Sequence, residues 1–533
     1  MFRVIFASVA VALTALWLFV WRAPFGTPQW HLTPNDAAWP AGAWLLPLGV
    51  VVIFGGAAAL SVYDRFKRAK SRKEQTNSTV TALVCLAVIG MLWPWALLGP
   101  GAVQSRADKV TLEGRFNIIA ALWSDVATEY FSAAYSFDDA RAYTRSYAAT
   151  QQDPKLRVQA HVATHPPGAV LWFYGVRKTY ESSPVLQSGL MTLAQTVTGQ
   201  TADELATAAR LTRETSARWF NTATPSPLPA GAVGAALLAA ILLGLSLVVA
   251  LPAVYGLAAL GGGDRAEQRG LLAAGLWILA PTTNLFAFTL DALVASGAAW
   301  ALYFAALAWN RMASGTEAVG AITPFRTASA SSNFYWLASG ITLALTTFLS
   351  IGALAVGAIL IGALLLYRPR GGARALLLGG GAFVIVWALL ALWGGFNPLE
   401  IALNAARAHR FATLETRGYW PWVWLNLAFW MLFIGWPTVA LLARGVKLYK
   451  ETPIAASGIC LGVATLGVLV LLCLSGNVRG EVERLWLFAL APVCALAVAN
   501  DAVNWKTWAM LLALQAVQTL LMAATLAPLV RPF

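Results

Sequence analysis

The stretch LLPLGVVVIFGGAAALSVYDRFKRAKSRK, residues 45–73, decides the fold class of this chain. Residues 45–62 carry no charge, and as an α-helix they are long enough to cross the hydrocarbon core of a bilayer. Residues 63–73 form the densest basic run in the chain, which is typical of a cytoplasmic loop of a membrane protein. The stretch therefore predicts a span that ends in the cytoplasm, followed by a third span, about residues 80–98, that runs outward.

Apolar runs of this kind recur along the chain of 533 residues, of which 59% are hydrophobic and only 11% charged. An ordinary soluble domain has roughly 25% charged residues. Lipid tolerates only helices or closed barrels as spanning structures, and these runs do not alternate as barrel strands do. We therefore predict an all-α, polytopic transmembrane helical bundle.

The basic loops agree with one alternating topology of about 13 spans with the amino terminus inside. The first helix is expected to stay uncleaved, because WRAPFG and no small-x-small site follows it. A long polar segment separates the third and fourth clear spans. The expected organisation is a three-span segment (1–99), an external and juxtamembrane segment (100–229) and a helical bundle (230–533).

The net charge of +13 follows from the basic loops, and no basic domain interleaved with aromatics indicates a nucleic-acid partner. All four cysteines fall inside apolar runs, where they are expected to behave as small core side chains. No Walker loop, dinucleotide fingerprint, HExxH motif or nucleophile elbow is present, which argues against ATP-driven transport and serine hydrolysis.

The polar segment concentrates the chemistry of the chain in SDVATEYFSAAYSFDDARAYTRSYAATQQDPKLRVQAHVATHPPG, residues 124–168. Its candidate catalytic or substrate-binding acids are Asp125, Glu129, Asp138 and Asp139. Each acid is either a general base or metal ligand, or an ordinary charge on a solvated loop helix.

The segment ends in THPPG, residues 164–168, whose two prolines fix the backbone and whose glycine permits a close approach or an unusual turn. His165 is thereby held at a defined place, and the simpler alternative is a stiff turn. The apolar run at 169–176 is too short to cross and is expected to lie at the interface or to dip into the membrane and return.

Further ionisable residues are predicted at the outer face. Asp291 lies in FTLDALVASG, either facing a cavity or a partner, or solvating a turn in the headgroup region. The other candidates for contact with a phosphate or sugar fall in two outer loops, where the alternative is that they are ordinary loop charges or self-compensating ion pairs: Arg407, His409, Arg410 and Arg417 in the first, and Arg479, Glu481, Glu483 and Arg484 in the second.

The order of these motifs resembles the GT-C superfamily of membrane glycosyltransferases, which includes lipid A aminoarabinose transferases and protein O-mannosyltransferases. The resemblance is carried by the acids of SDVATEYFSAA and DDARAYTRSYAA, by THPPGAVLWFY in place of a KPPL-like motif, and by the helix pair around Asp291. It covers about residues 125–309. The chain departs from the family in having two spans before the one that leads into this loop, and in the long polar insert at 178–228.

The resemblance implies transfer of a sugar, with inversion, from a polyprenyl-phosphate donor to an acceptor hydroxyl of a lipid, glycan or protein on the non-cytoplasmic face of the cell membrane. It implies Asp125 as the base, with Asp138 and Asp139 behind it, while His165 orients a substrate and the outer arginines hold the phosphate. No cofactor is expected, and a divalent metal stays open because members of the superfamily differ in metal use.

Two other functions fit the sequence less well. A secondary transporter of a small or lipid-linked solute predicts ionisable residues near the middle of several spans and broken helices in two matching halves. The second alternative is a non-catalytic scaffold or lipid-handling protein with a degenerate site. The acids of this chain concentrate in one long outer loop, which favours an enzyme.

Overall fold

The computed structural model describes residues 2–27, 30–32, 34, 41–67, 72–97, 104–106, 109–111, 129–152, 161–198, 201–219, 228–260, 265–314, 331–367, 371–451, 457–499 and 505–526. Almost all of these residues are helical, and the predicted all-α class is confirmed. The described strands form two small antiparallel hairpins, β1 (Phe25–Thr27) with β2 (Trp30–Leu32) and β3 (Gln104–Arg106) with β4 (Lys109–Thr111).

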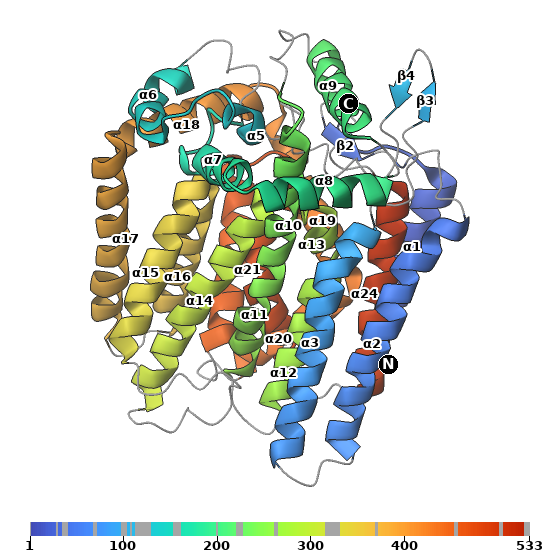
Figure 1. Ribbon diagram of the computed structural model, residues 1–533. Helices are drawn as coiled ribbons and strands as arrows, with labels where there is room; N and C mark the ends of the chain where they lie inside the picture. Colours follow the sequence, from blue (N-terminus) through green and yellow to red (C-terminus); the bar gives the residue numbers. More distant parts are fainter. Residues whose placement is uncertain are drawn as a thin grey trace.

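Most of the longer helices stand side by side in an upright bundle (Figure 1). The helices of the bundle and their short continuations are α1 (Phe2–Leu16), η1 (Trp17–Trp21), α2 (Leu45–Lys67), α3 (Arg72–Ala96), α10 (Ala232–Val249), α11 (Leu251–Ala259), α12 (Ala266–Leu279), α13 (Pro281–Leu285), α14 (Leu290–Ser314), α15 (Ser332–Leu349), η4 (Ile351–Ala353), α16 (Leu354–Tyr367), α17 (Gly372–Gly394), α19 (Tyr419–Ile434), α20 (Trp436–Glu451), α21 (Ser457–Ser475), α23 (Leu490–Ala497) and α24 (Trp505–Thr525). The remaining elements are η2 (Ala41–Trp44), α5 (Tyr130–Ala133), α6 (Ala140–Gln152), α7 (Gly168–Glu181), α8 (Pro184–Thr198), α9 (Ala202–Trp219), α18 (Pro398–His409), η5 (Arg410–Leu414), α22 (Val482–Leu485) and η6 (Leu487–Ala489).

Within the described part of the chain, eight helices are long and apolar enough to cross a membrane. A ninth span results if α19 and the first half of α20, which meet at a bend of 108°, cross as one unit. The sequence suggested about 13 spans. Two of these expected spans coincide with α12 and α16, which have 14 residues each and are shorter than a helix needs to be to cross a membrane. α12 is short because Pro281 disfavours helical backbone at the residue before it.

The bend between α19 and α20 is stabilised by polar side chains of α24. Gly435 has a φ of +91° at the break, so the carbonyl groups before it lose their helical partners. Gln515 Nε2 donates to the carbonyl of Ile434 at 2.7 Å, and Gln518 Nε2 donates to that of Leu432 at 2.8 Å. These two glutamines therefore satisfy backbone groups that lipid could not.

The core of the bundle is built mainly from alanine, leucine, valine and aromatic side chains, and the outer helices present further leucines to their surroundings. α17 shows the second property most clearly, with Leu377 76% and Leu392 75% exposed. Such faces suit a lipid environment, and the chain is a membrane-embedded multi-pass protein.

The helices between residues 130 and 219, together with α18, gather at one end of this bundle (Figure 1). Figure 1 shows α5, α6, α7, α8, α9 and α18 at the end opposite to the junction of α2 and α3. α7 begins at Gly168, directly after the two prolines, and lies across this end without spanning the bundle, as expected for a segment too short to cross. A Cβ on Gly168 would collide with the carbonyl oxygen of Phe348 in α15, so the glycine allows α7 to sit directly on that helix.

Candidate functional site

Four charged side chains form a continuous ion-pair network where α14, α22 and the loop before α19 meet. Arg484 donates from Nη1 to Asp291 Oδ2 at 3.1 Å and from Nη2 to Glu481 Oε2 at 2.6 Å. Arg417 Nη2 contacts the other oxygen of Glu481 at 2.9 Å. All four side chains are less than 20% exposed, so their interactions are only weakly screened by solvent.

Burial and charge act against each other in this network. Burial alone would raise the pKa of Glu481, but the adjacent Arg484 and Arg417 outweigh it and hold this pKa far below its usual range. Burial alone would lower the pKa of Arg484, but Glu481 and Asp291 raise it. Both groups therefore stay ionised, and the network is a fixed arrangement of charges.

The loop that carries Glu481 is held in an uncommon backbone conformation. Glu481 has a φ of +61°, a left-handed geometry that costs non-glycine residues free energy and persists only when the surroundings enforce it. Asn426 of α19 provides such support, because its Nδ2 donates to the carbonyl of Val478 at 2.7 Å and its Oδ1 accepts from the amide of Gly480 at 3.0 Å. Arg479 adds to it by donating to the carbonyl of Leu414 at 2.8 Å.

Glu129 is a second buried glutamate in left-handed backbone, with a φ of +52°. It immediately precedes Tyr130, the first residue of the short helix α5. Burial raises the pKa of the Tyr130 hydroxyl well above its usual value, an effect that Arg484 opposes and that Asp291, Glu129 and Glu481 reinforce. Tyr130 thus lies within electrostatic range of Glu129 and of three members of the network, Arg484, Asp291 and Glu481.

The turn that ends in His165 lies against Tyr130. The rings of His165 and His161 lie 5.2 and 6.5 Å from the Tyr130 ring, centroid to centroid. Two side chains of α6 hold this turn: the Tyr147 hydroxyl donates to the carbonyls of Val162 and His165, and Gln151 Nε2 donates to the carbonyl of Ala163 at 3.0 Å.

Both histidines are expected to be neutral at physiological pH. Burial lowers the pKa of each to about 4. Nδ1 of His165 lies 3.0 Å from both the carbonyl oxygen of His161 and the hydroxyl of Thr164. Because the carbonyl can only accept, the tautomer with Nδ1 protonated satisfies this contact and leaves Nε2 as an acceptor. An acceptor nitrogen at this position suits an incoming hydroxyl better than an anionic phosphate.

Glu483 is the most deeply buried carboxylate beside the network, at 2% exposure. Burial raises its pKa to about 7. The hydroxyl of Thr282 donates to its backbone carbonyl, which ties α22 to α13. Two glutamates in neighbouring positions therefore have opposite electrostatic character: Glu481 is paired and ionised, and Glu483 is desolvated and readily protonated.

The structure brings together some of the residues expected from the sequence. Glu129, His165, Asp291, Glu481 and Arg484 converge, and Arg417 with them. Asp125 lies outside the described residues.

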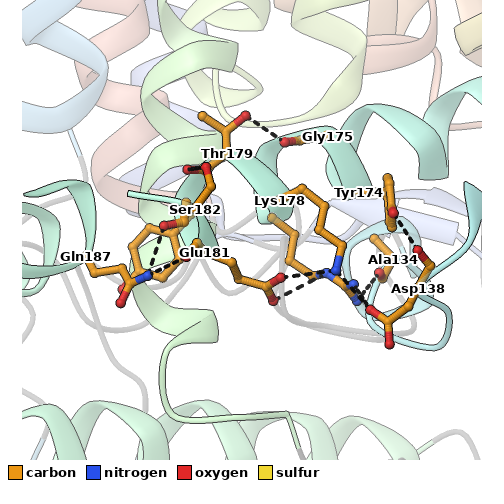
Figure 2. Close-up of polar contacts among 11 residues, drawn as sticks. Ala134, Asp138, Tyr174, Gly175, Lys178, Thr179, Glu181, Ser182 and Gln187 are labelled. Carbon is orange, nitrogen blue, oxygen red and sulfur yellow. Dashed lines mark hydrogen bonds and ion pairs between the residues drawn. The ribbon is translucent and has the colours of Figure 1, made fainter. Parts of the chain in front are cut away.

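Asp138 and Asp139 lie apart from the network and make structural contacts. Figure 2 shows Asp138 bound by Lys178 of α7, whose Nζ lies 3.0 Å from Asp138 Oδ1. Arg177 of the same helix pairs with the same oxygen through Nη2 at 2.5 Å. The Arg177 guanidinium also donates to the carbonyl of Ala134 at 2.8 Å, so this ion pair fastens the α5–α6 connection to α7. The hydrogen bonds from Lys178 and Arg177 lower the pKa of Asp138.

Asp139 caps the first turn of α6. Its Oδ1 accepts from the amide nitrogens of Arg141 and Ala142 at 2.8 and 3.0 Å, and these bonds lower its pKa.

Four further predicted residues line the outer loops without entering the network. His409 Nε2 contacts the carbonyl of Asn477 at 2.6 Å, and the guanidinium of Arg479 is directed at backbone carbonyls. Arg407 and Arg410 lie on the exposed face of α18 and η5.

Two residues of the site were not among the candidates from the sequence: Tyr130 and His161. The spacing HVATH places His161 one turn before His165, a signal that was available. Glu483 was predicted as part of the charged run at 479–484, but its deep burial depends on the packing of α22 against α13 and could not be read from that run.

No group of three or more His, Cys, Asp or Glu side chains is arranged to hold a metal ion within the part of the chain that the structure describes. Neither a family model, nor a curated protein, nor a solved structure matches this chain. The fold and the site therefore define its class on their own: an all-α membrane protein with a buried charged network at one end.

Proposed function

We propose that this protein is a membrane glycosyltransferase that moves a sugar from a polyprenyl-phosphate donor to an acceptor hydroxyl on the non-cytoplasmic side of the cell membrane, with inversion. The observation that carries the proposal is the convergence of Glu129, His165 and the Arg484 network at one end of an apolar bundle. A lipid-linked donor needs such a site, with charged groups for its phosphate next to a surface that admits its chain.

The chemistry divides between two groups of side chains. In the proposed reaction Glu129 removes the proton of the acceptor hydroxyl, and the acceptor oxygen forms a bond to the anomeric carbon. The bond from that carbon to the donor phosphate breaks on the opposite face, and the lipid phosphate leaves with the electron pair. Arg484 and Arg417 stabilise the charge that develops on this phosphate.

His165 fits the role of positioning the acceptor. Its neutral ring offers Nε2 as a hydrogen-bond acceptor for the hydroxyl, beside the Tyr130 ring. Glu129 is proposed as the base in place of Asp138 and Asp139, because these two make structural contacts on the surface.

The side of the membrane on which the charged network is proposed to lie is inferred from the basic residues at the junction of α2 and α3. α2 ends at Lys67 and α3 begins at Arg72, both at the end of the bundle opposite to α7 (Figure 1). The positive-inside bias assigns that end to the cytoplasm and the charged network to the other side, with the amino terminus inside.

The broken helix pair α19–α20 is the feature that would favour a transporter. Two of its freed carbonyl groups, those of Ile434 and Leu432, accept hydrogen bonds from Gln515 and Gln518, so side chains of α24 stabilise the break without a coupling ion. This contact favours the transferase.

The test is transfer activity of membranes supplied with a panel of radiolabelled polyprenyl-phosphate sugars. Glu129→Gln is expected to lower the rate by roughly 10²- to 10⁴-fold, the usual contribution of a general base. Asp138→Asn is the matched control and should keep the wild-type rate, since it changes an exposed acid of the same segment. Asp125→Asn is assayed in parallel, and full activity in both Glu129→Gln and Asp125→Asn would refute a carboxylate base in this segment.

A further inference from the structure

The exposed face of α18 combines apolar and basic side chains in a defined order. Leu399 and Leu403 are 74% and 59% exposed in its first half, and Arg407 and Arg410 follow on the same face, one and two turns later. The opposite face is buried against α6: Asn404 Nδ2 donates to the carbonyl of Ala148 at 3.4 Å, and Gln151 Nε2 donates to that of Ile401. α18 is therefore an amphipathic helix whose free face is neither purely polar nor purely apolar.

The elements before and after α18 indicate that lipid covers this face. α18 follows α17 after a three-residue connection, and Leu392, near the end of α17, is 75% exposed. Beyond η5, Trp420 and Trp424 at the start of α19 are 72% and 71% exposed, as tryptophans are at the level of lipid headgroups. Leucines on α18 thus continue a lipid-facing surface at the depth where that surface meets the headgroups.

Among the residues that the structure describes, the arginines on this face have only weak polar partners, so they can bind an anion. Arg410 approaches Glu415 only through Nε, at 3.7 Å, and both side chains are more than half exposed, so this pair contributes little. Arg407 Nη1 makes only a long contact, 3.4 Å, with Asn404 Oδ1. Glu400, the one acid of α18, lies in its first turn and about two turns from Arg407.

We propose that α18 binds an anionic phospholipid of the leaflet at this end of the bundle. The acyl chains lie against Leu399 and Leu403, and the phosphate is bound by Arg407 and Arg410. This site is separate from the Arg484 network and does not depend on the proposed transfer reaction.

Lipid binding to the purified full-length protein in neutral detergent tests this proposal. The melting temperature is followed during titration with phosphatidylglycerol or phosphatidylcholine, which gives an apparent affinity for each lipid. Phosphatidylglycerol should bind more tightly, and Arg407→Gln/Arg410→Gln should weaken its binding by roughly 30-fold, the effect of two basic side chains at an anionic surface. Phosphatidylcholine binding should be unchanged in this variant.

Two further variants locate the site. Arg210→Gln is the matched control, because Arg210 is also an exposed arginine next to a glutamate on a surface helix, and it should leave both affinities unchanged. Leu399→Ser/Leu403→Ser should weaken the binding of both lipids. Undiminished phosphatidylglycerol binding by the arginine double variant would overturn the proposal, and so would equal stabilisation of the wild type by free glycerol phosphate.

Discussion

Removal of the Arg484 charge should destabilise the protein more than any other single substitution in the ion-pair network. Arg484 binds Asp291 at 3.1 Å and Glu481 at 2.6 Å, and its own side chain is 11% exposed. In Arg484→Met, Glu481 keeps Arg417, whereas Asp291 keeps only the Thr289 hydroxyl at 3.3 Å. Breaking a buried pair costs about 3–5 kcal/mol, and because one carboxylate stays paired we expect about 3 kcal/mol.

The double variant Arg484→Met/Asp291→Asn separates charge from packing. It removes the charge that Arg484→Met leaves unpaired, so it should recover about 1–2 kcal/mol of the lost stability. Asp291→Asn alone should cost less than Arg484→Met, because Arg484 keeps Glu481. The assay is thermal unfolding of the four proteins in one detergent at one scan rate, since membrane proteins often unfold irreversibly. A double variant as unstable as the sum of the two single variants would refute the reasoning, because it would show no coupling between the two side chains.

Three more predictions follow from single positions. Gly168→Ala should destabilise the protein by about 1–3 kcal/mol and lower its melting temperature, because the added Cβ meets the backbone of α15. Gly175→Ala in the same helix has open space around the added Cβ and should raise stability by about 0.5–1 kcal/mol. Equal effects of the two substitutions would contradict the packing of α7 on α15. Burial lowers the pKa of His161 and of His165 to about 4, so between pH 4 and 6.5 the unfolded chain binds more protons than the folded protein, and stability should rise with pH across that window. The melting temperature of His161→Asn/His165→Asn should rise less with pH than that of wild type. An equal rise in the two proteins would contradict the burial of the histidines. The pKa of Glu483 is raised to about 7, so its contribution to stability falls as pH increases from 4.5 to 7. Glu483→Gln should therefore raise the melting temperature more at pH 8 than at pH 5. A larger increase at pH 5 would contradict the burial of this carboxylate.

Local patterns were enough to predict the class of fold and parts of the site. Apolar length predicted the helical bundle, and the two prolines of THPPG predicted where α7 begins. The same motif predicted the close approach at Gly168, because prolines and glycine restrict or free the backbone regardless of tertiary context. His165 and Asp291 were expected at the outer face, and both lie in the convergent site.

The roles of the acids depended on partners far away in the sequence. Asp138 and Glu129 look alike in a polar segment, but Arg177, 39 residues on, binds the first. Arg479, Glu481 and Arg484 form one mixed-charge run, yet Arg479 bonds to backbone carbonyls and the other two form the network. Which charge pairs with which is decided by the packing of α14, α19 and α22, and no local pattern encodes it.

The most direct test of the central claim follows the two halves of a lipid-linked donor. A polyprenyl-phosphate sugar carries tritium in the sugar and radioactive phosphorus in the phosphate, and it is supplied to the protein in vesicles together with membrane extract as the source of acceptor. The account predicts that wild type separates the two labels, with the sugar leaving the lipid, and that Glu129→Gln does not. Movement of both labels together across the vesicle membrane, with no separation, would contradict the account and identify a transporter.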